Sequence, residues 1–334
     1  MQGKEKRVPT QRDKKENKSI KKNGEENKIM SISIVFPIYN EEENILPLLN
    51  ATLPVISSLT KDFEIIFIDD GSKDKSPQIL KQLSKEKYIK VFTLKKNLGK
   101  ATALYVGFQK ATKDLIITMD SDLQDDPKEI PLLVQKIQEG YDFVNGWKKN
   151  KHVEKGDRLK RLPSLFFNNL TYALTRVDVH DYNCPFKAYR KQVEKELFLY
   201  GDMHRYIPVQ VGNMGYKYTE VVVSNYPRKF GVTKYGSSRI LRGVLDLITI
   251  KYLVGYKNRP LHAFGTLGLL IGGLGLLIDT YLFGLWILGQ GIGSRPLLML
   301  GVLLTFIGLQ FISLGLLGEM MTNNMVRDQD SLIK

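Results

Sequence analysis

The chain has 334 residues, enough for two or more domains, and its 49 Lys and Arg exceed its 35 Asp and Glu to give a formal net charge of +14. Its single cysteine, Cys184, excludes an intramolecular disulfide framework and fits a reducing cytoplasm. The positive charge suits nucleic acid, an anionic membrane or phosphorylated ligands as partners, so its distribution along the chain must decide between them.

The first 28 residues, 1–28, are rich in Lys, Glu and Asn and have no apolar periodicity. A segment of this composition does not bury enough apolar surface to fold, so we predict a disordered basic arm. Because the arm is polar throughout, it lacks the apolar stretch of a cleavable signal peptide.

Residues 29–236 alternate between short apolar runs and helical patterns. Strands are predicted at 32–36, 63–68, 90–94 and 115–119. Helices are predicted after each of them: one at 44–59, a second that begins near Ser76, a third that ends at Lys110 and a fourth that begins at Pro127. This alternation predicts an α/β fold with a mostly parallel, doubly wound sheet. Ligands of such sheets bind at the carboxyl ends of the strands. The polar residues that follow the four strands are therefore expected to form one continuous site.

An acidic cluster directly follows the fourth predicted strand. Asp120, Asp122 and Gln124 alternate by two, so an extended stretch would direct all three side chains to one side. Carboxylate and amide oxygens are ligands that Mg²⁺ and Mn²⁺ prefer, and such a cation bridges a diphosphate well. A solvated acidic turn is the alternative interpretation, which the preceding strand makes less favourable.

Two apolar stretches near the C-terminus, 263–288 and 296–318, are each long enough to cross a bilayer as a helix. The short connector between them predicts an antiparallel hairpin within residues 261–320. Gly268 and Gly272 have the small-xxx-small spacing that lets membrane helices approach closely. Asp279 lies within the first span and is expected to pair with the second span or with a neighbouring subunit.

Basic residues gather just before the first span, which predicts the orientation. The segment 237–260 has apolar residues at helical spacing with basic ends, as in an amphipathic juxtamembrane helix. Residues 228–259 carry eight Lys and Arg against the single acidic residue Asp246. By the positive-inside rule, the large α/β domain and both termini, including the tail 321–334, are cytoplasmic in a multi-pass protein of the cell membrane.

Four motifs carry a family resemblance. They are Pro37-x-Tyr39-Asn40-Glu41, Asp69-Asp70-Gly71-Ser72, Asn97-x-Gly99-Lys100 and Asp120-x-Asp122-Leu123-Gln124-Asp125. With them, the chain from Ser31 to about Arg259 resembles the family-2 nucleotide-sugar glycosyltransferases of the GT-A fold. The added helix pair resembles the polyprenyl-phosphate branch, which includes dolichol-phosphate mannose synthases and bacterial undecaprenyl-phosphate glycosyltransferases.

The resemblance implies roles for the motif residues. The donor nucleotide would be bound by Pro37, Tyr39, Glu41, Asp69, Asn97, Lys100 and Asp120. The cofactor, Mg²⁺ or Mn²⁺, would be bound by Asp120, Asp122 and Gln124. For Asp69 and Asp70, a turn or a helix cap is the structural alternative.

On the acceptor side, Lys148 stands where the family normally has Arg, which keeps the charge but loses the bidentate fork. The acceptor phosphate would be held by Lys148, Arg158, Arg161, Arg228 and Lys234. Asp122, Asp181 and Arg228 are the candidate catalytic residues, with Asp181 orienting the acceptor or a loop and not serving as a base. Cys184 is assigned to packing.

The implied reaction is transfer of a sugar from a UDP- or GDP-linked donor to a polyprenyl phosphate, undecaprenyl or dolichyl, with metal assistance and inversion. Transfer to another lipid acceptor and a catalytically silent membrane scaffold stay as alternatives. A processive polysaccharide synthase is disfavoured because its Gln-x-x-Arg-Trp motif is missing. Nucleic acid is not expected as a partner, since many basic residues cluster beside the spans. A homo-oligomer is compatible with the sequence.

Overall fold

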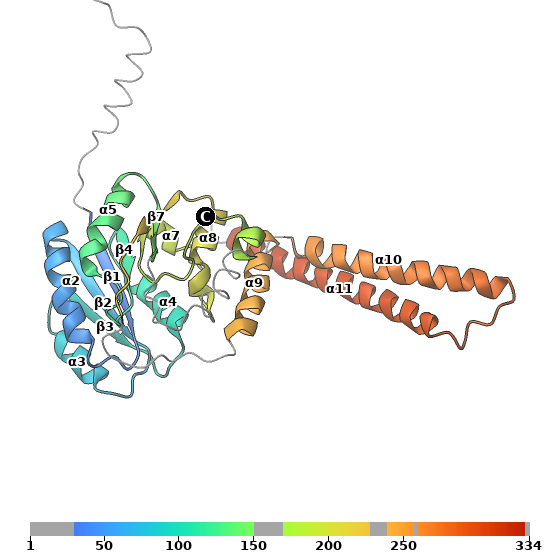
Figure 1. Cartoon of the computed structure of the whole chain (residues 1–334), viewed down its shortest axis with the longest axis horizontal. Helices are drawn as coiled ribbons and strands as arrows, with labels where there is room; N and C mark the ends of the chain where they lie inside the picture. The colour runs from blue at the N-terminus through green and yellow to red at the C-terminus, as the bar shows by residue number, and fades with distance from the viewer. Residues whose placement is uncertain (1–29, 150–169, 228–238, 257–258, 331–334) are drawn as a thin grey trace, which may run out of the picture.

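The computed structural model describes residues 30–149, 170–227, 239–256 and 259–330. It consists of an α/β body from which a long pair of helices projects (Figure 1). The arm predicted at residues 1–28 lies outside the described residues. So do the residues between 149 and 170 and those between 227 and 239.

The elements follow the predicted alternation in the N-terminal half. In chain order they are β1 Ile32–Ile38, α2 Ile45–Leu59, β2 Phe63–Asp69, α3 Ser76–Leu83, β3 Ile89–Thr93, α4 Lys100–Lys110, β4 Leu115–Thr118, η1 Pro127–Glu129, α5 Ile130–Gln138, β5 Phe143–Trp147, β6 Lys187–Arg190, α7 Lys191–Glu194, η2 Met203–Tyr206, α8 Ile207–Asn213, β7 Tyr218–Val222, α9 Arg239–Gly255, α10 Pro260–Ile287 and α11 Pro296–Asp330. All four predicted strands are confirmed.

The described strands form one sheet in the order β3-β2-β1-β4-β6-β5-β7. β1 pairs in parallel with β2 and β4, and β2 pairs in parallel with β3. β6 runs antiparallel between β4 and β5. The mostly parallel sheet is confirmed, and the reversed strand β6 has a consequence for the site, because its first residue lies at the edge where β4 ends.

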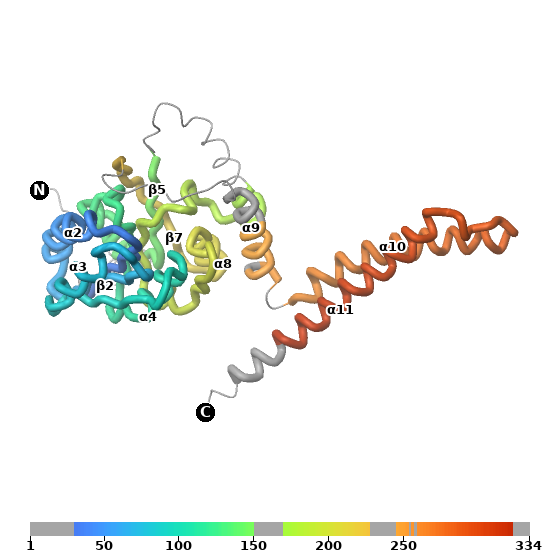
Figure 2. The backbone as a smooth tube through the Cα atoms, turned by 90° about the horizontal axis from the view of Figure 1, so that it is seen from below, coloured from blue at the N-terminus to red at the C-terminus, as the bar shows by residue number. Residues whose placement is uncertain are grey.

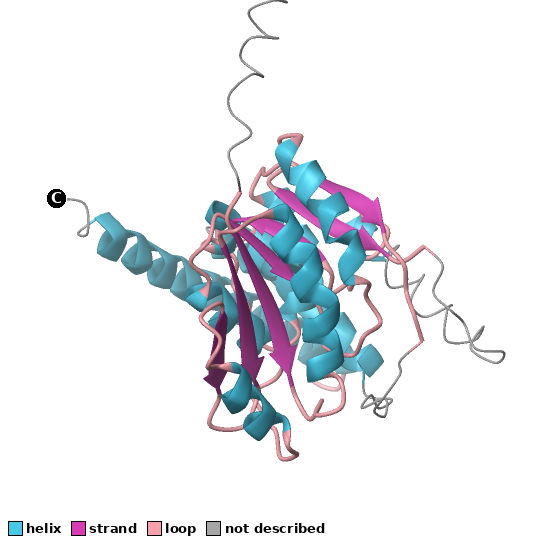
Figure 3. Cartoon of the chain, turned by 90° about the vertical axis from the view of Figure 1, so that its left-hand side faces the viewer, coloured by secondary structure: helices cyan, strands magenta, loops and turns pink. Residues whose placement is uncertain are grey.

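Helices cover both faces of the sheet (Figure 3). On one face, buried aliphatic residues of α2, α3 and α5 pack against Ile34, Phe36 and Phe67. On the other face, α4, α7 and α8 pack against Val35 and Ile66. Strands buried on both faces read as continuous apolar runs, which is why the sequence marked them clearly.

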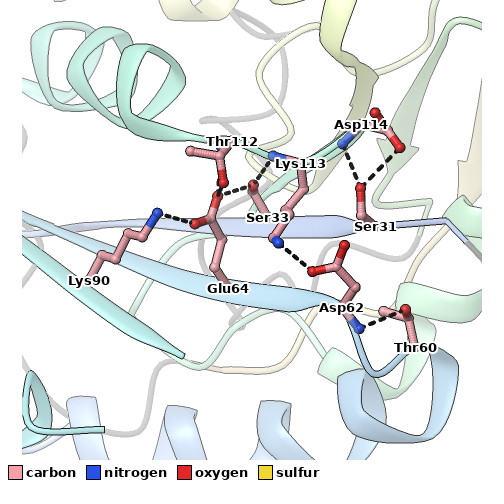
Figure 4. Close-up of polar contacts among 9 residues, drawn as sticks. All are labelled: Ser31, Ser33, Thr60, Asp62, Glu64, Lys90, Thr112, Lys113 and Asp114. Atoms are coloured by element: carbon pink, nitrogen blue, oxygen red, sulfur yellow. Dashed lines mark hydrogen bonds and ion pairs between the residues drawn. The ribbon is translucent and has the colours of Figure 1, made fainter. Parts of the chain in front are cut away.

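A buried polar network closes the amino edge of the sheet, opposite the candidate site (Figure 4). The Glu64 carboxylate accepts from Ser33 Oγ at 2.6 Å and from the Thr112 backbone N–H at 2.6 Å, and it pairs with Lys90 Nζ at 2.5 Å. Burial raises the pKa of Glu64, but the hydrogen bonds from Lys90, Ser33 and Thr112 together hold it below the usual value. The ionised form is therefore stabilised by folding.

Replacing Glu64 with Gln should lower the free energy of unfolding by about 1–2 kcal/mol at neutral pH, since the network keeps one acceptor oxygen but loses the negative charge that pairs with Lys90. Because folding depresses the pKa of Glu64, this contribution is complete above the unfolded pKa near 4.5 and is lost as pH falls through the folded value. Urea denaturation at pH 7 and pH 3 measures it. The control is Asp62→Asn, which breaks an exposed pair with Lys113 and should change stability little. Equal losses at both pH values would contradict this assignment.

Helix α9 connects the body to the projecting helices (Figure 2). Its Leu247 and Ile250 are buried against Val177, Tyr206 and their neighbours. Leu245 and Ile248, in contrast, are exposed. The helix is thus docked on the α/β body along one side and carries apolar side chains on another, as the amphipathic pattern predicts.

Helices α10 and α11 are long and apolar enough to cross a membrane, and few of their residues are buried inside the protein. Exposed apolar side chains such as Leu277 and Met299 cover their outer surfaces, at 70% and 78% exposure. A buried helical hairpin in a soluble core would instead hide these side chains. α11 continues to Asp330, so the segment predicted as a tail begins as an extension of the second helix.

The two helices meet along a seam of small residues. A Cβ added at Gly308 would lie 2.4 Å from Gly272 Cα, and one added at Gly268 would lie 2.6 Å from the Gly308 carbonyl oxygen. The close approach predicted from Gly268 and Gly272 is confirmed. Asp279 accepts from Thr305 Oγ1 at 3.2 Å, so its pairing within the chain is with the second helix.

Replacing Gly308 with Ala should destabilise the hairpin by about 1–3 kcal/mol, because the nearest atoms are backbone atoms of Gly272 that cannot rotate away. Gly273→Ala is the matched control, since a Cβ there meets nothing within 4 Å. The two variants are compared by the loss of circular dichroism as a denaturing detergent is added to the micelles, which gives an unfolding midpoint for each. Equal unfolding midpoints for the two variants would rule out close packing of the helices at Gly308.

Candidate functional site

The loops after β1 and β2 are tied together at the carboxyl edge of the sheet. The backbone N–H of Asn40 donates to Ser72 Oγ at 2.9 Å, and the Lys73 N–H donates to Asn40 Oδ1 at 2.7 Å. Asn40 has a left-handed backbone with φ 53°, which Asn tolerates better than most residues. The tie holds the first two motifs in one wall of the site.

Asp69 ends β2 and is completely buried. Its Oδ1 accepts from the Ser72 N–H at 2.9 Å, while Oδ2 has no hydrogen-bond donor among the described residues. A buried carboxylate oxygen without a donor is costly unless a ligand supplies one. The geometry therefore fits the expectation that Asp69 accepts from a nucleotide.

The other expected donor residues lie around this wall. Pro37, Tyr39 and Glu41 are half-buried, and Asn97 is exposed. Glu41 accepts from Asn44 Nδ2 at 2.6 Å, which places its carboxylate beside the start of α2.

Asp70 shapes the third motif. Its two carboxylate oxygens accept from the backbone N–H groups of Leu98 at 2.7 Å and Gly99 at 2.9 Å. Burial raises the pKa of Asp70, and the hydrogen bonds from Leu98 and Gly99 act against that rise. Gly71, with φ 70°, lies so close to this loop that a Cβ would be 2.7 Å from the carbonyl carbon of Lys96. Asp70 thus stabilises the loop before α4, in agreement with the alternative that it serves a turn or a helix cap.

The acidic cluster lies next to the third motif, because Lys100 Nζ is 2.5 Å from Asp120 Oδ1. The alternating, extended arrangement expected for Asp120, Asp122 and Gln124 is wrong, however. β4 ends at Thr118, and Leu123 has a left-handed backbone with φ 59°. The chain therefore turns within the motif, and Asp122 Oδ1 accepts from the Gln124 N–H at 3.2 Å.

This turn is also hydrogen-bonded to the segment that follows β7. The carbonyl oxygen of Gln124 accepts from the Tyr226 N–H at 2.9 Å. Among the described residues no group of three or more His, Cys, Asp or Glu side chains is arranged to hold a metal ion.

Lys148 forms a buried ion pair with Asp125, with Nζ 2.6 Å from Oδ1 and side-chain exposures of 8% and 0%. Burial raises the pKa of Asp125 to about 6, while Lys148 acts to lower it and Asp120 to raise it. The charge expected to meet an acceptor phosphate is thus engaged inside the protein. The role of Lys148 as an acceptor contact stays a prediction.

Asp181 belongs to a loop that is hydrogen-bonded to Asn145 of β5. Its carbonyl oxygen accepts from Asn145 Nδ2 at 2.9 Å, and the same Nδ2 donates to Glu220 Oε1 at 3.0 Å. Its side chain is 4% exposed. Cys184, further along the loop, is buried in the core cluster and burial raises the pKa of its thiol to about 12, so the packing role is supported.

Arg158, Arg161, Arg228 and Lys234 lie outside the described residues. Two further charged residues, to which the sequence assigned no separate role, lie beside the described candidate side chains in the structure. They are Asp125, the partner of Lys148, and Lys187, the buried first residue of β6. The sequence shows Asp125 within the acidic motif and Lys187 in the segment that forms β6, but it does not show which groups they contact.

Residues 33–198 match the family Glycosyl transferase family 2. A dodecaprenyl-phosphate galacturonate synthase of Rhizobium johnstonii is 39% identical over 308 residues, which cover 90% of each chain. The chain belongs to glycosyltransferase family 2. An undecaprenyl-phosphate 4-deoxy-4-formamido-L-arabinose transferase of Shewanella sediminis is 35% identical and covers 86% of each chain.

The fold agrees with this family assignment. The glucosyl-3-phosphoglycerate synthase of Mycobacterium tuberculosis, solved with Mn²⁺, UDP and phosphoglyceric acid, is similar with a TM-score of 0.51 and 20% identity. The match covers 67% of this chain and 78% of that one. The α/β body is therefore a GT-A-like domain, and the protein is a glycosyltransferase.

Proposed function

We propose that this glycosyltransferase moves a sugar from a nucleotide diphosphate donor onto a polyprenyl phosphate at the cytoplasmic face of the membrane. The observation that carries the proposal is the likeness over 90% of the chain to a dodecaprenyl-phosphate galacturonate synthase. The second relative is likewise named for an undecaprenyl-phosphate acceptor. The apolar hairpin supplies the membrane anchor that such an acceptor requires.

The wall built by the first two motifs would bind the nucleoside. Asp69 offers a buried acceptor oxygen with no donor among the described residues, which suits a ring N–H or a hydroxyl group. The loop anchored by Asp70 places Lys100 at the start of α4, beside Asp120. Pro37, Tyr39, Glu41 and Asn97 would complete the nucleotide contacts.

A divalent cation, Mg²⁺ or Mn²⁺, fits the residues present. Mg²⁺ is commonly held by one or two carboxylates together with substrate phosphates, so Asp120 and Asp122 suffice without a larger protein cluster. Gln124 would add an amide oxygen. When bound, the cation would neutralise charge that develops on the leaving diphosphate.

The acceptor phosphate needs no strong base. A phosphate monoester has a second pKa near 6 and is largely ionised at neutral pH. One of its oxygens would attack the anomeric carbon in line, forming a new C–O bond while the bond to the nucleoside diphosphate breaks and that group leaves with the electron pair. This displacement inverts the anomeric carbon. Asp181 would orient the acceptor, and Arg228 with Lys234 would bring positive charge to it.

The orientation follows from charge. The eight Lys and Arg of residues 228–259 precede the first span, whereas the connector between the spans has only Arg295. The α/β body and both ends of the chain are therefore assigned to the cytoplasmic side. Proteolysis of right-side-out and inverted vesicles would test this, with cleavage of the body expected only in the inverted ones.

A transfer assay tests the function. Purified protein is incubated with undecaprenyl phosphate, Mn²⁺ or Mg²⁺ and radiolabelled UDP- and GDP-sugars. UDP-galacturonate is included because the 39% identical relative is named a galacturonate synthase. We expect label from one donor in the organic phase, and loss of that label with EDTA. Absence of transfer from every donor by a folded, nucleotide-binding protein would overturn the acceptor assignment.

A further inference from the structure

A small hollow, with room for about one oxygen-sized group, lies beside the candidate donor site, between α4, the loop that contains Asn183 and the segment η2. Lys100, Asn183, Lys187 and His204 contribute polar side chains to its lining. Lys100 is the residue paired with Asp120, so the hollow adjoins the place proposed for the diphosphate. Of these four residues, only Lys100 belongs to one of the four sequence motifs.

The register of β6 brings Lys187 to this edge. Lys187 pairs with Thr118, the last residue of β4, and Asp120 follows two residues later in the chain. Because β6 runs antiparallel to β4, its first residue lies where β4 ends. An otherwise distant lysine thereby reaches the edge at which parallel α/β sheets bind their ligands.

The charge of Lys187 is buried and only weakly compensated. The residue is 2% exposed, and Nζ donates to the carbonyl oxygen of Cys184. No carboxylate of the described residues forms an ion pair with it. An ammonium group taken out of water is costly unless an anion meets it.

The titration of the lysine agrees with that cost. Burial lowers the pKa of Lys187 to about 8, and Lys100 lowers it further, while Cys184, Asp181 and Asp120 act to raise it. A side chain held in this condition gains from the arrival of an anionic ligand, because the ligand replaces the missing counter-charge. Among the described residues the ammonium group donates only to Cys184, so two of its three donors could serve such a ligand.

We infer that Lys187, with Lys100, Asn183 and His204 around it, forms a pocket that receives one phosphate oxygen of one of the two phosphorylated substrates. The inference rests on the proposed function, which supplies both substrates with phosphate. Lys187 would reduce the repulsion between the donor diphosphate and the acceptor phosphate as they approach. It is a substrate-binding residue additional to those of the four motifs.

The test compares Lys187→Met with wild type and with Lys136→Met, an exposed lysine paired with Glu139 on α5. We expect Lys187→Met to lower kcat/KM for transfer by about 100-fold, as for other charged groups that contact reacting oxyanions. Lys136→Met should behave as wild type. Lys187→Arg, which keeps the charge, should retain more activity than Lys187→Met.

Stability separates this role from a structural one. Removing a buried ammonium group that lacks a carboxylate partner should leave the thermal midpoint of Lys187→Met unchanged or raised. A variant that loses activity together with a clear fall in its midpoint would overturn the inference. So would a variant that transfers sugar at the wild-type rate.

Binding measurements distinguish the two sources of phosphate and do not depend on turnover. UDP and GDP serve as donor probes, and undecaprenyl phosphate in detergent micelles serves as the acceptor probe. A weaker affinity of Lys187→Met for the nucleotide assigns the pocket to the donor, and a weaker affinity for the lipid assigns it to the acceptor. Unchanged affinities for both would overturn the inference, whereas a wild-type enzyme that binds both without transfer would count against the proposed function alone.

Discussion

Asp122→Asn should lower the rate of sugar transfer by about 10²–10³-fold, the range found when one group that stabilises developing charge is removed. Asp122 is 6% exposed and accepts from the Gln124 N–H, so the turn holds its carboxylate in one position. Asparagine keeps the size and one acceptor oxygen but removes the negative charge that would bind a cation. The fold should therefore survive while the metal affinity falls.

Two measurements check this expectation. The initial rate is followed against Mn²⁺ or Mg²⁺ concentration, and the metal concentration for half-maximal rate should rise in the variant. The matched control is Asp126→Asn, which makes the same charge change in the same cluster at a residue whose carboxylate caps η1 through the Lys128 N–H. An Asp122→Asn enzyme with wild-type rate and unaltered metal requirement would show that Asp122 is not a metal ligand.

The second large effect concerns the Lys148–Asp125 pair. Lys148→Met should lower the free energy of unfolding by about 3–5 kcal/mol, because it leaves a buried carboxylate without its counter-charge. Adding Asp125→Asn to the same chain removes that charge and should recover part of the loss. The two single variants and the double variant together form a cycle that measures the coupling.

The loss should depend on pH. Burial already raises the pKa of Asp125 to about 6 in the intact pair, and removal of Lys148 raises it further. The folded variant then keeps a proton that the unfolded carboxyl has released, so its stability falls as pH rises through this range. Guanidinium denaturation should show a smaller loss at pH 5 than at pH 8. An equal loss at both values would mean that Asp125 is not ionised beside Lys148.

The same pair affects how Lys148 is interpreted. The sequence suggested that lysine at a family arginine position keeps a weaker phosphate contact. In the structure its ammonium group holds Asp125, which follows the proposed metal ligands Asp120 and Asp122. Lys148 thus positions the acidic turn, and its contact with the acceptor stays to be tested by the lipid affinity of the variants.

Local patterns in the sequence were sufficient for the framework. Apolar runs bounded by turn residues located β1, β2, β3 and β4, since strands buried on both faces have no polar interruption. Long apolar stretches with glycine spacing located α10, α11 and their seam. Asp69, Lys100 and Asp120 were placed at one edge because parallel strands end together.

Contacts between distant segments required the tertiary structure. The spacing of Asp120, Asp122 and Gln124 suggested an extended chain, but the left-handed backbone at Leu123 turns the chain there. Alternation of residue types does not specify the backbone torsion angles of a loop. The partner of Lys148 and the burial of Lys187 depend on where β5 and β6 enter the sheet, and strand order is set by packing between segments far apart in the chain. The sequence by itself thus determined the family, the α/β domain and the apolar hairpin, and it predicted roles for the residues of the four motifs. The tertiary structure decided which charges meet, since desolvation and pairing arise only when the strands are assembled.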